Sequence, residues 1–243
     1  MKIIYVLVLL FITYSAFVYC RFKYVLSRAN LQEIVQTDKK LGVGRKLKYI
    51  AAGDSTAVGE GASAVTETYT YQLAEQLAKT NEVEYKNVGV LGAKTDDLIK
   101  HQLQQIIEFN PDVVTISIGA NDVTHNHSPD SIIKNFTIIS NELTQKTHAQ
   151  IYITNIPIVD QAPLLPYFYR KFLGYRVKKI NPQISHLESD RVHIIDIHGF
   201  GWDQYKEIAV TFANDKFHPN DQGYDNWTNA FLSKLAKQTQ INF

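Results

Sequence analysis

Two polar stretches, far apart in the sequence, contain residue types that hydrolytic enzymes use for catalysis. Gly53-Asp54-Ser55 directly follows an apolar run, and Asp215-Lys216-Phe217-His218 lies near the carboxyl end. An imidazole can remove the proton of a serine hydroxyl that attacks a carbonyl, and a nearby carboxylate can orient that imidazole. The residue types therefore favour Ser55 as a nucleophile with Asp215 and His218 as its base. A helix cap at Ser55 and a structural histidine are the alternative interpretations.

Two further stretches offer hydrogen-bond donors for a developing negative charge. Gly92 ends the stretch that begins at Asn87, and a glycine there lets a backbone NH approach a substrate closely. Asn121, within Gly119-Ala120-Asn121-Asp122, carries an amide that can donate to an oxyanion. Taken singly, each stretch is also explained as a simple turn.

The elements that must position these stretches alternate between strand-like and helix-like patterns. Short apolar runs typical of buried strands are Leu47 to Ala52, Val83 to Val90, Val113 to Ile118, Ile151 to Ile156 and Val192 to Ile197. Helical stripes separate them, and a last helix follows around Trp227. This alternation predicts a mainly parallel sheet with helices on both faces. Ligands bind beyond the carboxyl ends of such strands, and the polar stretches are predicted to meet there.

In this order the four stretches resemble the sequence blocks of the SGNH (GDSL-like) hydrolases. Thr56 stands where that family usually has the leucine of the GDSL name, at a position without a catalytic role. The resemblance spans about Lys46 to Leu235, which is nearly all of the chain beyond its apolar start. It implies an α/β fold, namely a flavodoxin-like three-layer α/β/α sandwich with a five-stranded parallel sheet. It also implies hydrolysis of carboxylic esters.

The resemblance further implies a role for each residue of the blocks. Ser55 attacks the ester carbonyl, His218 takes its proton and later protonates the leaving alcohol, and Asp215 orients His218. The backbone NH groups of Ser55 and Gly92, together with the Asn121 side chain, form the oxyanion hole. This chemistry needs neither a metal nor an organic cofactor.

Composition narrows the possible partners and sites. The net charge of +1 gives no global attraction to nucleic acid. Cys20 is the only cysteine, which excludes a disulfide framework and a multi-cysteine zinc site. His125 and His127 form an HxH pair, but no carboxylate pattern supports a metal site there. Asp54 and Asp122 are interpreted as residues that hold their turns.

The amino terminus begins with an uncharged apolar run from Ile3 to Cys20. Its length is about the minimum for a helix that spans a bilayer. We predict an anchor over residues 1–20, a juxtamembrane connector over 21–45 and the catalytic domain over 46–243. No convincing processing site follows the run, so retention of the anchor is favoured, with the catalytic domain outside the cytoplasm. A cleaved signal peptide and a secreted enzyme are the alternative.

The segment from Pro157 to Arg176 is unusually apolar for a loop at the catalytic edge. Four of its side chains are predicted to line an acyl pocket or to touch a membrane surface, and these are Leu164, Leu165, Tyr167 and Phe168. The alternative is a helix that packs its apolar face on the domain. Basic residues within and after this segment are interpreted either as contacts for anionic lipid or as the solvent-exposed face of a helix.

Three functions follow from these observations. The first is hydrolysis of acyl esters, such as small lipid esters or lysophospholipids, by a monomeric enzyme. The second is removal of acetyl groups from a cell-wall carbohydrate, which would need an open and polar groove. The third is a non-catalytic, membrane-tethered binding module, and the complete set of Ser55, Asn121 and His218 argues against it.

Overall fold

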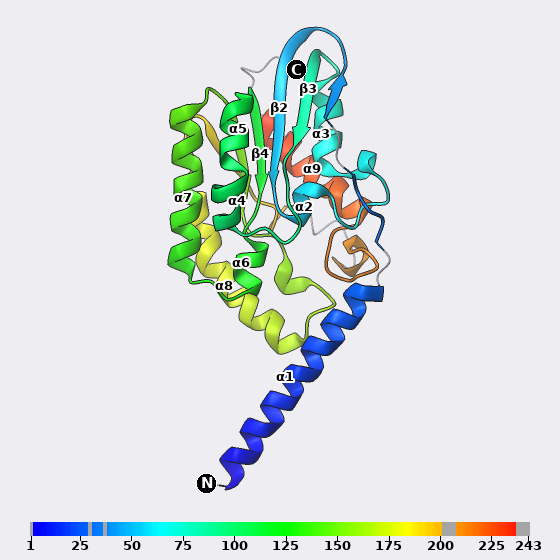
Figure 1. Ribbon diagram of the computed structural model, residues 1–243, viewed down its shortest axis with the longest axis vertical. Coiled ribbons are helices and arrows are strands. Elements are labelled where there is room, and N and C mark those ends of the chain that lie inside the picture. The colour runs from blue at the N-terminus through cyan, green and yellow to red at the C-terminus, as the bar shows by residue number, and fades with distance from the viewer. Residues whose placement is uncertain (1, 29–30, 36–37, 201–207, 237–243) are drawn as a thin grey trace.

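A sheet of six strands runs through the described structure, which covers residues 2–28, 31–35, 38–200 and 208–236 (Figure 1). In this computed structural model the strand order is β1-β3-β2-β4-β5-β6. β2 to β6 pair in parallel, and β1 runs antiparallel along the outer edge of β3. The strands are β1 (Lys39–Leu41), β2 (Arg45–Gly53), β3 (Asn81–Asn87), β4 (Val113–Ser117), β5 (Gln150–Thr154) and β6 (Val192–Ile195).

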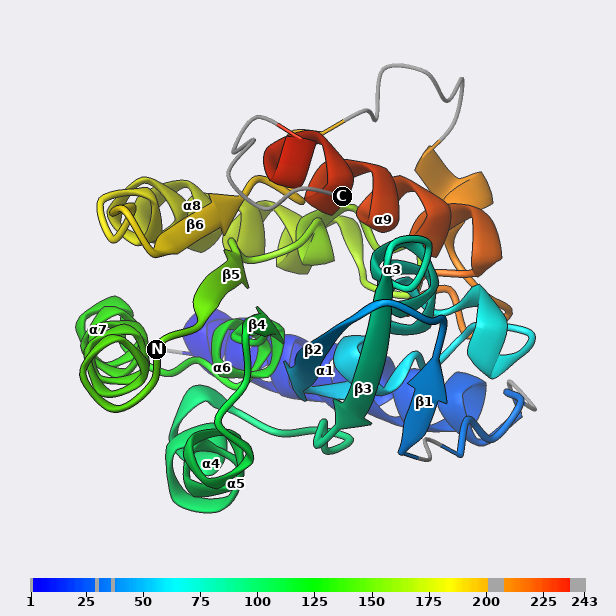
Figure 2. The same ribbon diagram turned by 90° about the horizontal axis from the view of Figure 1, so that it is seen from above.

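Helices cover both faces of this sheet and complete the three layers (Figure 2). On one face lie α4 (Thr95–His101), α5 (Leu103–Phe109), α7 (Pro129–Lys146) and α8 (Tyr167–Ser185), and on the other lie α3 (Tyr69–Leu77) and α9 (Asp221–Ala236). The shorter helices are α2 (Ser55–Val58), α6 (Ala120–Thr124) and the 3-10 turns η1 (Val65–Glu67), η2 (Val159–Gln161) and η4 (Ile208–Thr211). The three-layer α/β/α sandwich predicted from the sequence is confirmed.

The apolar run of β2 supplies both layers of the core. Successive side chains of a strand point to opposite faces, so a strand buried on both faces must be apolar throughout. Ile50 and Ala52 accordingly join the core under α4, α5, α7 and α8, whereas Tyr49 and Ala51 join the core under α3 and α9. This burial fixes the register of β2, and with it the place where Gly53 ends the strand.

β1 was not predicted, because the sequence analysis assigned its residues to the juxtamembrane connector. Lys39 and Lys40 give no apolar signal, and the strand is only three residues long. Main-chain pairing to β3 holds it, with Lys40 opposite Glu84. Charged residues on a short edge strand also discourage pairing with other chains. The folded domain therefore begins before residue 46, and the sheet has an antiparallel edge in addition to its five parallel strands.

The amino-terminal helix α1 (Lys2–Arg28) extends away from the sheet (Figure 1). It runs past Cys20, the predicted end of the apolar anchor. Its stretch from Ile4 to Val25 is long and apolar enough to cross a membrane, and none of that window is buried against the rest of the chain. Near its carboxyl end Phe22 meets Phe217 edge to face, with ring centroids 6.3 Å apart.

Candidate active site

Ser55 is the first residue of α2 and stands directly beyond the carboxyl end of β2. The Asp54 carboxylate caps this short helix by accepting from the Thr56 NH at 2.9 Å and from its hydroxyl at 2.7 Å. Gly53 has a φ of +136°, and a Cβ there would lie 1.8 Å from the carbonyl oxygen of Ser117. The Gln102 side chain bonds both the NH and the carbonyl of Gly53 at 2.8 Å. The turn that presents Ser55 is therefore fixed from several sides.

His218 and Asp215 lie on the loop before α9 and complete a chain of hydrogen bonds with Ser55. The Ser55 Oγ is 3.0 Å from His218 Nε2, and His218 Nδ1 is 2.5 Å from Asp215 Oδ2. The other oxygen of Asp215 accepts from the backbone NH groups of Phe217 and His218 at 2.9 and 3.0 Å. Asp215 is fully buried, so its carboxylate is held in a single orientation toward the imidazole.

The charges around His218 set its protonation. Burial alone would lower the pKa of the imidazole, but the hydrogen bond to Asp215 and the nearby carboxylates of Glu60 and Asp215 raise it above its ordinary value. For Asp215, burial alone would raise the pKa, but the hydrogen bond and the charge of His218 lower it. The loop therefore favours an ionised Asp215 beside an imidazole that is a stronger base than usual.

Glu60 was not found by the sequence analysis. Its Oε2 lies 3.3 Å from His218 Nε2, the same nitrogen that faces Ser55. The backbone of Glu60 is held by its NH, which donates to the Ser55 carbonyl at 2.9 Å, and by its carbonyl, which accepts from the Tyr224 hydroxyl at 2.8 Å. Gly61, with a φ of +99°, passes so close to the Pro219 carbonyl that a Cβ would not fit. No motif marks Glu60, and its neighbour in space, Tyr224, is far away in the sequence.

Two of the three predicted oxyanion donors, Gly92 and Asn121, lie on segments that a hydrogen bond joins. Gly92 follows β3, has a φ of +73°, and has nothing within 4 Å of the position that a Cβ would take. Asn121 lies on α6, and its Nδ2 donates to the carbonyl of Ala93 at 3.0 Å. That amide nitrogen carries a second hydrogen, which can be offered to a substrate. The bond to Ala93 ties α6 to the loop that carries Gly92.

A pocket opens beside Ser55 and brings together three of the predicted site residues. Ser55, Asn121 and His218 line it, whereas Gly92 is not among its lining residues. The other walls are mainly apolar and come from segments distant in sequence. They consist of Ala120, Pro157, Ile158, Val159, Phe212, Phe217, Pro219 and Trp227, together with Thr56 and Thr211.

The side chains predicted from the apolar segment do not line this pocket. Leu164 and Leu165 are buried, and Leu165 belongs to the core under α8. Tyr167 and Phe168 begin α8 and face outward, with exposed fractions of 58% and 76%. The pocket wall comes instead from the start of the segment, from Pro157 to Val159. The prediction missed this because hydrophobicity alone does not tell which side of a segment faces the serine.

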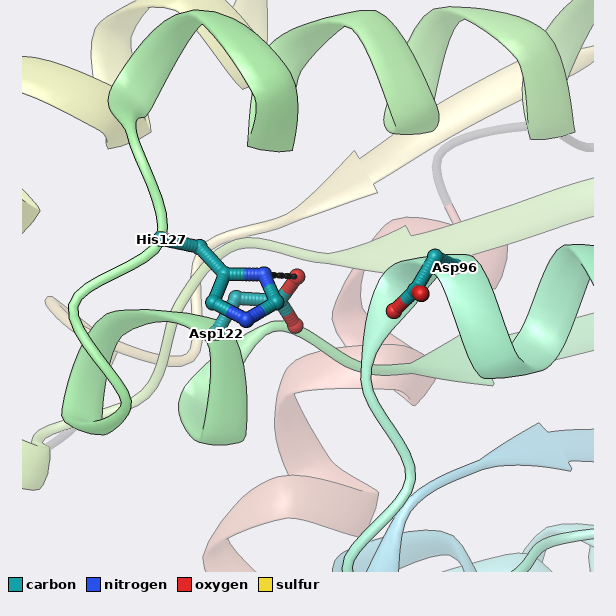
Figure 3. A group of neighbouring side chains, drawn as sticks. All are labelled: Asp96, Asp122 and His127. Atoms are coloured by element: carbon teal, nitrogen blue, oxygen red, sulfur yellow. Dashed lines mark ion pairs between the residues drawn. The ribbon is translucent and has the colours of Figure 1, made fainter.

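Asp96 and Asp122 form a group with His127, the second histidine of the HxH pair (Figure 3). Their ligand atoms lie within 4.8 Å of one another. Asp122, however, already accepts from the Thr95 NH at 3.0 Å and from the Thr95 hydroxyl at 2.6 Å. Its carboxylate thus joins the start of α4 to α6, as expected for a residue that holds its turn. Thr95 is the first residue of α4.

Comparison with known proteins places the chain in a family. The family model for the GDSL-like lipase/acylhydrolase family matches residues 51–225. No curated protein matches the chain.

Several solved structures share the fold. A lipase/acylhydrolase from Enterococcus faecalis is 20% identical with a TM-score of 0.61, covering 79% of this chain and 96% of that one. An acetylxylan esterase from Geobacillus stearothermophilus is 19% identical with a TM-score of 0.58, covering 80% and 96%. A phospholipase A1 from Streptomyces albidoflavus is 18% identical with a TM-score of 0.57, covering 77% and 99%. At these identities the likeness shows the fold and does not choose a substrate.

Proposed function

The chain belongs to the GDSL-like lipase/acylhydrolase family and is a carboxylic ester hydrolase, and we propose that Ser55, His218 and Asp215 are its catalytic triad. The observation that carries this proposal is the continuous line of hydrogen bonds from the Ser55 hydroxyl through both nitrogens of His218 to the buried Asp215. This arrangement lets a serine act as nucleophile near neutral pH.

The proposed reaction proceeds through an acyl-enzyme. The Ser55 oxygen attacks the ester carbonyl while its proton moves to His218 Nε2, and the carbonyl oxygen becomes an oxyanion. The backbone NH groups of Ser55 and Gly92 and the side chain of Asn121 stabilise that oxyanion. When the intermediate collapses, the bond to the alcohol breaks and the alcohol leaves with the proton from His218. Water then attacks the acyl-enzyme by the same steps and regenerates Ser55.

The preferred substrate is an ester with an apolar acyl group, such as a small lipid ester or a lysophospholipid. The pocket beside Ser55 supports this choice, because its walls include Ile158, Val159, Phe212 and Trp227. Apolar walls gain free energy from a buried acyl chain, in proportion to the area removed from water. Removal of acetyl groups from a carbohydrate is the second candidate, and one of the structures with this fold is an acetylxylan esterase.

We also propose that α1 remains attached and anchors the catalytic domain in a membrane, outside the cytoplasm. The apolar helix from Ile4 to Val25 supports this, because its only charged residues, Arg21 and Lys23, lie near its carboxyl end. All of its backbone groups except those at its ends are satisfied internally, as hydrocarbon requires. Mass analysis of the mature protein should find this segment retained. A chain that starts after it, recovered free in the medium, would contradict the anchor.

Labelling with a serine-directed phosphonate tests the triad. Wild-type protein should take up one phosphonate on Ser55, and Ser55→Ala should take up none and lose esterase activity while remaining folded. Ser185→Ala, an exposed serine of α8, is the matched control and should behave like wild type. Near-wild-type hydrolysis by Ser55→Ala would refute the assignment. Esters of increasing acyl length, compared with acetylated sugars, then separate the two candidate substrates.

A further inference from the structure

Exposed apolar side chains gather at one edge of the catalytic domain. Outside α1, the large apolar residues that are exposed in the described part of the chain are Val35, Val43, Val90, Leu91, Tyr167, Phe168, Phe172, Tyr175 and Val210. All except Val35 and Val43 lie on three elements that start or end at the carboxyl edge of the sheet. These are the loop after β3, the first half of α8, and η4, which precedes the loop of His218.

The first half of α8 projects beyond this edge. α8 connects two parallel strands, β5 and β6, so it starts at the carboxyl edge and runs back along the sheet. A helix of its length is about 28 Å long, whereas β5 is about 17 Å long, because a helix rises about 1.5 Å per residue and a strand about 3.3 Å. In Figure 1 the first turns of α8 lie beyond α7, at the end of the molecule from which α1 extends, and the exposed aromatic residues of α8 begin on these turns.

The exposed aromatic residues of α8 alternate with exposed lysines. We call this surface the α8 face, and it consists of Tyr167, Phe168, Lys171, Phe172, Tyr175, Lys178 and Lys179. Lys171 lies over the Tyr167 ring at 5.3 Å and Lys179 over the Tyr175 ring at 4.5 Å. Amphipathic rings with adjacent cations are typical of surfaces at the boundary between lipid and water. The lysines also match the negative charge of anionic headgroups.

The beginning of α8 is bonded to the elements that carry the site. The Leu164 NH, just before the helix, donates to the carbonyl of Lys216 at 3.0 Å, on the loop between Asp215 and His218. The Tyr169 hydroxyl donates to the carbonyl of Thr124 at 2.7 Å, at the end of the helix that carries Asn121. A surface that receives the α8 face is therefore also close to the pocket.

The proposed membrane anchor leaves the domain at the same edge. Phe22, near the end of α1, contacts Phe217, which lines the pocket and precedes His218. Figure 1 shows α1 and the beginning of α8 at the same end of the molecule. With α1 in a bilayer, the pocket and the α8 face would both stand at the surface of that bilayer.

We propose that the α8 face lies on the surface of the bilayer that holds α1, and that the pocket beside Ser55 receives ester lipids directly from that surface. This proposal rests on the proposed ester hydrolase function and its anchor. The aromatic rings insert among the headgroups while the lysines contact anionic lipid, so the domain has one orientation on the membrane. The β1–β2 turn, at the opposite edge of the sheet, then points away from it.

Quenching by brominated phospholipid tests this orientation in the full chain. The chain is reconstituted in vesicles of phosphatidylcholine and phosphatidylglycerol, and insertion is checked by flotation. Phe168→Trp puts an indole on the α8 face. Val43→Trp, in the β1–β2 turn, is the matched control because Val43 is 84% exposed at the opposite edge. The wild-type chain gives the background of its own two tryptophans, which is subtracted.

We expect loss of fluorescence for Phe168→Trp and none beyond the background for Val43→Trp. Equal quenching of both indoles would overturn the docking. Absence of quenching at residue 168 would also overturn it, and this is the result expected if a second copy of the chain covered the α8 face. Failure to float would overturn anchor and docking together. The same measurement in the Ser55→Ala background separates docking from catalysis, because loss of the chemistry should leave the quenching unchanged.

Discussion

The two sides of the His218 ring differ in burial, and this difference separates two kinds of electrostatic control. On the Nδ1 side, Asp215 is fully buried and accepts three hydrogen bonds from the imidazole and two backbone NH groups. On the Nε2 side, the ring faces the pocket, where Ser55 lies at 3.0 Å and the partly exposed Glu60 at 3.3 Å. A fixed, buried carboxylate such as Asp215 orients the imidazole ring. A carboxylate near solvent, such as Glu60, mainly changes the pKa of that ring.

This difference in burial predicts that removing the charge of Asp215 and removing the charge of Glu60 will have unequal effects on the reaction. On the Nδ1 side, substitution of Asp215 should change both the orientation and the tautomer of His218, because the Asp215 carboxylate holds the Nδ1 hydrogen bond. On the Nε2 side, the proposed mechanism moves the proton between Ser55 and His218 whether or not Glu60 is charged. We therefore expect that substitution of Asp215 causes a large loss of rate, and that substitution of Glu60 shifts the pH dependence of the rate.

Asp215→Asn should give the largest effect. An amide can hold the geometry but stabilises the wrong tautomer, and the turnover number should fall by about 10⁴. The measurement is the rate with a short-chain soluble ester, and the melting temperature shows whether the fold persists. Asp190→Asn, an exposed carboxylate before β6, is the matched control. A loss of less than about tenfold with an intact fold would mean that Asp215 does not orient His218.

Asn121→Ala should give an intermediate effect on the Nε2 side. In the proposed oxyanion hole the Asn121 amide contacts charge that develops only in the transition state, so the turnover number should fall by about 10²–10³ with a smaller change in KM. Since Asn121 also donates to the carbonyl of Ala93, thermal denaturation must accompany the kinetics. A change confined to KM would show that Asn121 binds the substrate without stabilising the oxyanion.

The sequence predicted those parts of the fold and of the candidate site that depend on residues close together in the chain. The apolar runs predicted the parallel strands because burial on both faces leaves a signal in the strand itself. Ser55, Asn121, Asp215 and His218 could be named as candidates because each belongs to a short block of the sequence. β1 was missed because pairing to β3, and not its own hydrophobicity, makes it a strand.

Features formed by tertiary packing were missed for a related reason. Glu60 reaches His218 only because the turn after α2 passes against the loop of Pro219. The pocket wall at Pro157 to Val159 and the outward position of Phe168 depend on where α8 begins and on what packs beneath it. These contacts between distant segments cannot be predicted from the spacing or the types of the residues. The apolar segment was recognised, but its inner and outer sides could not be separated.

Glu60→Gln should give the smallest change in rate and the most specific change in pH dependence. The free enzyme is active when His218 is neutral, because only then can Nε2 accept the Ser55 proton. The charge of Glu60 raises the pKa of His218 by favouring the imidazolium. Without that charge the pKa falls, so the acidic limb of the kcat/KM profile should move to lower pH. A unit charge at about 4 Å contributes about 1 kcal/mol in water, so the plateau rate should fall by no more than about tenfold.

The pH profile of kcat/KM with a soluble ester decides whether Glu60 acts in this way. Glu75→Gln removes the same charge from an exposed position on α3 and should leave the profile unchanged. High salt should reduce the difference between Glu60→Gln and wild type, because Glu60 is partly exposed and its charge is screened. A limb that stays in place, or that moves to higher pH, would show that Glu60 does not stabilise the imidazolium. The Nε2 side would then be controlled by Ser55 and the substrate alone.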